Sequence, residues 1–101
     1  MMQTPITITV EELHEQMRLI PSELELVDVR TLEKHQAFNI GGKHIPFEEM
    51  PQRFHELDKN KVIITYCTSG NRSMRALLYL QSLGFDKVRS LSGGMTAWLA
   101  K

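Results

Sequence analysis

The stretch "VIITYCTSGNRSMRALLYL", residues Val62 to Leu80, decides the fold of this chain. It opens with a run of β-branched and aromatic residues, the pattern of a strand that is covered on both faces. The run ends at Cys67, the only cysteine of the chain, and gives way to a short loop, Thr-Ser-Gly-Asn. A helical pattern of apolar residues starts near Arg72. The sequence therefore predicts a buried strand, a loop and a helix around Cys67.

The residues before this stretch repeat the alternation of helix and strand. Thr9 and Glu12 have the spacing of a capping box, and the apolar pattern after them predicts a helix over about residues 10–19. "LELVDVR", residues 24–30, is typical of a second, mostly buried strand. A short helix is expected next, over residues 31–37.

The remaining segments continue the same order. The glycines and proline of "NIGGKHIPF", residues 39–47, predict a turn that leads into a very short strand. "FEEMPQRFHEL", residues 47–57, has helical spacing and predicts an amphipathic helix. Gly84 is expected as the left-handed cap of the helix after Cys67, followed by a strand over residues 87–91 and a last short helix within residues 92–100.

Strands that alternate with helices indicate an α/β fold, because parallel strands are joined by helical crossovers. We expect a small open parallel sheet of about five strands with helices on both faces. At 101 residues and 42% hydrophobic content, the chain fits one domain over residues 1–101. In such sheets ligands bind beyond the carboxyl ends of the strands, which is where Cys67 lies.

Charge and cysteine content exclude several function classes. Twelve basic and twelve acidic side chains cancel, and no basic block is present, so nucleic acid is not expected as a partner. One cysteine allows no internal disulfide and favours a reducing compartment, so we expect a cytoplasmic protein. We expect neither a signal peptide nor a membrane segment.

The loop after Cys67 has the composition of an anion-binding loop. Gly70 and Asn71 are residue types that adopt left-handed backbone conformations, so the loop can curl and point its N–H groups inward. Such a loop at a helix N-terminus lowers the pKa of a thiol and can hold a second anion beside it. The predicted site comprises Cys67 as nucleophile and, as binding residues, Thr68, Ser69, Gly70, Asn71, Arg72 and Ser73.

The alternative is that Cys67 is a packing residue, because free cysteine is among the most buried residue types. Packing alone gives no reason for a strand end, a small polar loop, an arginine and a helix start to occur together. We therefore favour the functional interpretation.

Three segments of the chain resemble the rhodanese-like family. They are "YCTSGNRSMRALLYLQSLGF" (residues 66–85), "LVDVR" (residues 26–30) followed by Glu33, and "VRSLSGGMTAW" (residues 88–98). They stand in the family's order. One segment departs from the usual Gly-His-Ile-x-Gly-Ala pattern, since this chain has Phe-Asn-Ile-Gly-Gly-Lys at residues 38–43.

The resemblance implies a thiosulfate sulfurtransferase-like enzyme or a carrier of sulfane sulfur. Cys67 would accept sulfur from thiosulfate or a protein persulfide, hold it as a persulfide, and pass it to a thiol, cyanide or a sulfur-relay protein. The amides from Thr68 to Arg72 would cradle the persulfide, while Arg72 and Ser73 would orient the loop. No metal or organic cofactor is implied.

Two alternatives to sulfur transfer remain. Related phosphatases share the cysteine and arginine chemistry, but their loop has one more intervening residue than the four found here. A catalytically silent interaction module is the other alternative, although the cysteine is intact. Arsenate reduction and thioredoxin-like exchange commonly need further cysteines, which this chain lacks.

Other polar residues are assigned structural roles. Asp28, Arg30 and Glu33 are expected to tie neighbouring loops together by ion pairing. The four histidines lack metal-ligand spacing and are expected at the surface or in turns.

Overall fold

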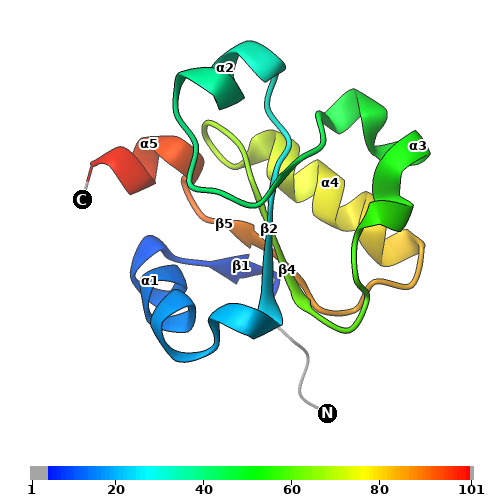
Figure 1. The fold of residues 1–101 in the computed structure, drawn as a ribbon, viewed down its shortest axis with the longest axis horizontal. Coiled ribbons are helices and arrows are strands. Elements are labelled where there is room, and N and C mark those ends of the chain that lie inside the picture. The colour runs from blue at the N-terminus through cyan, green and yellow to red at the C-terminus, as the bar shows by residue number, and fades with distance from the viewer. Residues whose placement is uncertain (1–4, 101) are drawn as a thin grey trace.

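The computed structural model describes residues 5–100. Helices and strands alternate along most of this range (Figure 1). In chain order the elements are β1 Thr7–Ile8, α1 Val10–Leu19, η1 Pro21–Glu23, β2 Leu24–Asp28, α2 Leu32–Ala37, β3 Lys43–His44, η2 Phe47–Glu49, α3 Met50–Arg53, η3 Phe54–Glu56, β4 Val62–Tyr66, α4 Asn71–Ser82, β5 Val88–Leu91 and α5 Gly94–Leu99, where η marks a 3₁₀ turn.

The strands form one parallel sheet in the order β1-β5-β4-β2-β3, which confirms the predicted α/β class. The central strand is β4, and its residues from Val62 to Tyr66 pair with β2 from Leu24 to Asp28. Strand β1 was not predicted. Its two residues, which pair with β5, are too few to show the alternation by which strands are recognised.

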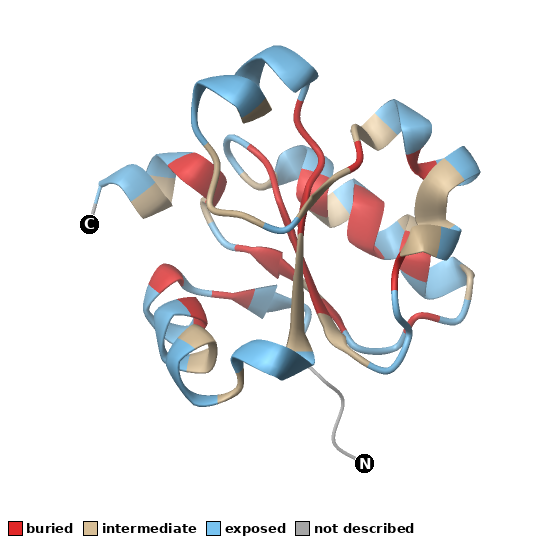
Figure 2. Cartoon of the chain, viewed as in Figure 1, coloured by how far each residue is buried: buried red, intermediate tan, exposed pale blue. Residues whose placement is uncertain are grey.

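Helices cover both faces of the sheet, and β4 supplies side chains to each core. Ile63 belongs to the cluster that includes Leu77 of α4, whereas Ile64 and Tyr66 belong to the cluster that includes Leu13 of α1. Figure 2 shows the buried residues along the strands and on the inner side of α4. This two-sided burial explains the continuous apolar run that begins at residue 62.

Most predicted boundaries are confirmed to within two residues. Helix α1 begins after a capping box, in which the Glu12 amide donates to Thr9 Oγ1 at 3.0 Å and the Thr9 amide donates to Glu12 Oε1 at 2.9 Å. Gly84 lies beyond the end of α4 with φ of +92°, as a left-handed cap requires.

The single helix predicted over residues 47–57 is wrong. The segment consists of η2, the short α3 and η3, in which 3₁₀ bonds close the two outer turns. Pro51 has no amide hydrogen to donate to the Phe47 carbonyl, so a continuous α-helix would lack a bond there. The apolar spacing still predicted burial correctly, because Met50 and Leu57 lie in the core.

Three segments meet at the carboxyl end of the sheet: α2, the loop between β4 and α4, and the start of α5 (Figure 1). Within residues 5–100, the helices are too short or too polar to cross a bilayer.

Candidate active site

The loop between β4 and α4 wraps around the sulfur of Cys67. The amide of Gly70 donates to Sγ at 3.1 Å and the amide of Ser73 donates at 3.3 Å, while Ser73 Oγ lies 3.4 Å from Sγ. Gly70 caps α4 in the left-handed region, with φ of +106°. A residue with a Cβ would be strained there, so this glycine allows the loop to curl around the sulfur.

These donors favour the thiolate of Cys67. Burial disfavours a charged sulfur, since only 3% of the residue is exposed. Hydrogen bonds from the Ser73 side chain and from the amides of Ser73, Gly70 and Ser69 outweigh burial and lower the pKa of Cys67 below its ordinary value. The loop therefore favours the ionised form of the Cys67 sulfur.

The other predicted site residues divide into two groups. Thr68 and Ser69 form the exposed part of the loop, and Asn71 and Arg72 start helix α4. Asn71 is helical rather than left-handed, because within residues 5–100 only glycines have positive φ. Arg72 is half-exposed and points its guanidinium toward the pocket, 4.0 Å from Glu48. Ser73 contacts the sulfur directly, whereas Arg72 lines the pocket.

Helix α5 holds the loop from the other side. The amide of Met95 donates to the Cys67 carbonyl at 2.8 Å and the amide of Thr96 donates to the Thr68 carbonyl at 3.0 Å. Gly94 makes this approach possible, because a Cβ there would lie 2.3 Å from the Cys67 carbonyl oxygen. The helix predicted within residues 92–100 therefore holds the backbone of the Cys67 loop.

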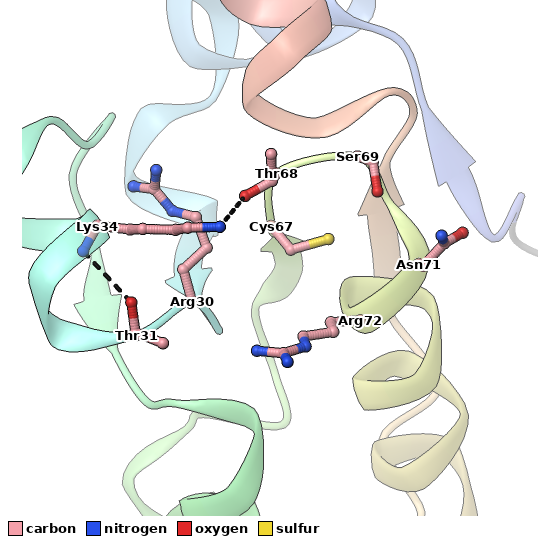
Figure 3. Close-up of a pocket in the computed structure, with 8 residues that line it drawn as sticks. All are labelled: Arg30, Thr31, Lys34, Cys67, Thr68, Ser69, Asn71 and Arg72. Atoms are coloured by element: carbon pink, nitrogen blue, oxygen red, sulfur yellow. Dashed lines mark hydrogen bonds between the residues drawn. The ribbon is translucent and has the colours of Figure 1, made fainter.

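A pocket of about 370 Å³ opens in front of Cys67. It lies between α2 and the start of α4 (Figure 3). The residues that line it are Arg30, Thr31, Lys34, Cys67, Thr68, Ser69, Asn71 and Arg72.

The pocket carries more positive charge than predicted. Lys34 reaches from α2 toward the loop, where its Nζ donates to Thr68 Oγ1 at 3.4 Å (Figure 3), and no ion pair joins it within the described residues. Arg72 pairs only loosely with the exposed carboxylate of Glu48, at 4.0 Å. Arg30 is neutralised by its ion pair with Asp28. Two cations thus face the pocket without a close counter-ion, which favours an anionic ligand.

Comparison with known proteins identifies the family. The chain matches the model of the rhodanese-like domain over residues 9–101. It belongs to the rhodanese-like domain family.

Relatives handle sulfur, according to their names. The sulfurtransferase of Allochromatium vinosum is 38% identical over 74 residues, which is 72% of this chain and 69% of that protein. YrkF of Bacillus subtilis, named as a candidate sulfur carrier protein, is 38% identical over 79 residues, 77% of this chain but only 43% of YrkF. A rhodanese-like domain protein of Staphylococcus aureus superimposes with a TM-score of 0.82 at 31% identity, covering 96% of this chain and 91% of that one.

Behind the pocket of this rhodanese-like domain lies a buried ion pair, as predicted for Asp28 and Arg30. Arg30 Nε donates to Asp28 Oδ1 at 2.9 Å and Nη2 donates to Oδ2 at 2.7 Å. Burial of Asp28 is outweighed by hydrogen bonds from Arg30 and His35, which hold its pKa below the ordinary value. Glu33 is exposed and takes no part in this pair.

Two histidines were expected at the surface or in turns and instead join this pair. His35 Nδ1 lies 2.9 Å from Asp28 Oδ2, and His44 Nε2 lies 2.8 Å from the Arg30 carbonyl oxygen. The two imidazole rings stack with centroids 4.4 Å apart. Their separation in the sequence hides this contact, which depends on the pairing of β2 with β3.

The segment that departs from the rhodanese-like pattern keeps its turn by other contacts. Asn39 Nδ2 donates to the His35 carbonyl at 2.9 Å, and the Asn39 Oδ1 accepts from the Gly41 amide at 2.9 Å. Tyr66 donates its hydroxyl to the Gly41 carbonyl at 3.0 Å. The turn is therefore tied both to α2 and to the end of β4.

Proposed function

We propose that this rhodanese-like domain is a sulfurtransferase that carries sulfane sulfur on Cys67. The observation that carries the proposal is the sulfur itself, which sits among inward-pointing amides and faces a cationic pocket. Amide donors stabilise a negative sulfur whether it is a thiolate or the end of a persulfide. The sulfurtransferase and sulfur-carrier names of its relatives support the same chemistry.

The first step loads sulfur. The Cys67 thiolate attacks the outer sulfur of thiosulfate, a new S–S bond forms, the S–S bond of thiosulfate breaks, and sulfite leaves with the electron pair. Lys34 and Arg72 lie where they can attract the doubly charged donor. The product is a persulfide anion on Cys67.

The second step unloads it. A nucleophile such as cyanide or a thiolate attacks the terminal sulfur, and the Cys67 thiolate leaves with the electron pair of the S–S bond. The amides of Gly70 and Ser73, which already point at Sγ, stabilise this leaving group. No metal or redox partner enters either step, and the acceptor is a small nucleophile or a relay protein.

Mass spectrometry of the intact chain tests the proposal. Incubation with thiosulfate should add the mass of one sulfur atom, and later cyanide should remove it. Cys67→Ser should gain no sulfur. Combining Cys67→Ser with Ser82→Cys moves the single thiol to the exposed end of α4, away from the loop amides, and should load far more slowly.

Equal loading of the relocated thiol would contradict a role for the loop, and absence of loading in the native chain would refute the proposal. A phosphate-ester assay on the same samples tests the phosphatase alternative, for which we expect no activity that depends on Cys67. A chain that neither loads sulfur nor cleaves esters would fit the interaction-module alternative.

A further inference from the structure

The proposed chemistry does not use the histidine pair behind the pocket. His35 and His44 stack in nearly parallel planes, 11° apart, between α2 and β3. His35 touches Asp28, whose other contacts hold the pocket residue Arg30. His35, a titratable group, is therefore linked through Asp28 to Arg30, a cation that lines the pocket.

The hydrogen bonds fix where each neutral ring carries its proton. Asp28 is an ionised acceptor, so His35 must donate from Nδ1, which leaves Nε2 free to take a proton. The Arg30 carbonyl can only accept, so His44 donates from Nε2. Of the two stacked rings, only His35 contacts a carboxylate, so a proton taken up at its Nε2 adds a positive charge beside Asp28.

Proton uptake changes the charge behind the pocket. With neutral His35, Asp28 and Arg30 cancel, and only Lys34 and Arg72 act on a bound anion. With protonated His35, the negative charge of Asp28 is shared between two cations, and the buried group becomes positive by one unit. Asp28 and Arg30 are buried and 19% of the His35 side chain is exposed, so water screens this change less than it would at the open surface.

We propose that His35 is a positioning and charge-setting residue whose protonation strengthens binding of the anionic sulfur donor in the Cys67 pocket. The proposal rests on the function proposed above, since it assumes an anionic donor. By linkage, a bound anion must in turn favour protonation of His35 by the same factor.

The other charged groups around His35 do not replace it. Tyr66 stays neutral, because burial and the charge of Asp28 raise the pKa of its hydroxyl. Lys34 and Arg72 are the cations that line the pocket itself. Cys67 does titrate, and its thiolate repels an anion as pH rises, so it must be removed to isolate His35.

Inorganic sulfate is a suitable probe, since it is a dianion that cannot transfer sulfur. Its affinity is measured in the full chain carrying Cys67→Ser, at constant ionic strength, between about pH 5.5 and 8. We expect binding to weaken by about fivefold or more from the low end to the high end of this pH range. NMR signals of the His35 ring should show their midpoint moving to higher pH when sulfate is added.

Three further variants in the same background separate the causes. His35→Gln keeps a donor for Asp28 without a titratable proton, so sulfate affinity should lose this pH dependence. Lys34→Gln should weaken sulfate binding at every pH and retain the dependence. His55→Gln, at an exposed position on η3, should behave like the parent.

Retained pH dependence in His35→Gln would overturn the proposal, as would a His35 midpoint that sulfate does not move or the absence of sulfate binding in the pocket. The NMR midpoint is measured with the native His35 in place, so the proposal can still be refuted if His35→Gln fails to fold. None of these readouts involves sulfur transfer, so they can fail while Cys67 still loads sulfur, and the reverse.

Discussion

Ser73 contacts the sulfur of Cys67 through two groups, its amide and its hydroxyl. The hydroxyl also lies 2.7 Å from Ser90 Oγ and 3.1 Å from the Gly70 carbonyl oxygen. It therefore links the sulfur of Cys67 to the neighbouring strand β5. At the scale of one residue, this hydroxyl is the part of the thiolate site that mutation can remove without changing the loop backbone.

Ser73→Ala should slow alkylation of Cys67 by iodoacetamide about fivefold near neutral pH, because the lost hydrogen bond destabilises the thiolate and raises its pKa. The sign follows from the direction of the shift. Below the pKa the rate tracks the thiolate fraction, which falls, and well above it both proteins are fully ionised and the rates converge. The measurement is the alkylation rate as a function of pH.

Ser90→Ala is the matched control, since it breaks the same hydroxyl pair without touching the sulfur. Its profile should stay close to that of the native chain. Identical profiles for Ser73→Ala and the native chain would show that the amides alone set the pKa of Cys67.

The residues near the sulfur could be predicted from the sequence, whereas the far wall of the pocket could not. Residues 67–73 are contiguous, so a strand end and a helix start already place them together. Lys34 comes from another crossover and reaches Thr68 only after β2 and β4 pair. Arg30 was correctly predicted to form an ion pair, but its position in the pocket wall depends on the same pairing.

At the scale of elements, α5 stabilises the loop after Cys67 by donating two amides to it. Gly94, at its first turn, lies against the backbone of Cys67 and Thr68, and its φ is +55°. The helix is short, so its place depends on this contact and on the core residue Met95.

Gly94→Ala should lower the free energy of unfolding by about 2–4 kcal/mol, because the new methyl group cannot fit beside the Cys67 carbonyl and α5 must shift. Sulfur loading should slow as well, since the loop loses its two amide contacts. Urea unfolding and the rate of persulfide formation measure the two effects.

Gly41→Ala provides the comparison. Gly41 also has positive φ, +97°, but its Cβ would meet nothing within 4 Å, so only backbone strain of about 1 kcal/mol is expected. Equal losses in the two variants would mean that strain, rather than the contact with the loop, explains the effect at Gly94.

The periodicity of apolar residues predicted the type of an element wherever a single continuous helix or strand packs against the core. The segment from residue 47 to 57 fails this condition, because its apolar side chains reach the core from three consecutive short turns. Spacing of three or four residues fits such turns as well as a helix. Pro51 is the signal against continuity, because it has no amide hydrogen to donate within a helix.

At the scale of the molecule, the sheet separates two cores that share β4. Ile63 packs into the core under α3 and α4, and Ile64 packs into the core under α1 and α5. Because neighbouring residues of one strand serve opposite faces, loss of either core removes half of the support of β4. The two cores should therefore unfold together.

Leu80→Ala removes a fully buried side chain from the α4 core and should lower the free energy of unfolding by about 3 kcal/mol. Trp98, the only tryptophan, packs on the opposite core, so its fluorescence reports the far side of the sheet. We expect its urea transition to shift as far as the transition seen by circular dichroism, because β4 couples the faces.

Leu78→Ala, two residues earlier on α4 but more than half exposed, should leave both transitions nearly in place. The decisive comparison is between the circular dichroism and fluorescence midpoints of Leu80→Ala. If circular dichroism shifts while the fluorescence of Trp98 keeps its native midpoint, the α1 and α5 face unfolds on its own. The loop after Cys67, which is joined to β4 and bonded to α5, would then lose its contacts with α5 before those with β4.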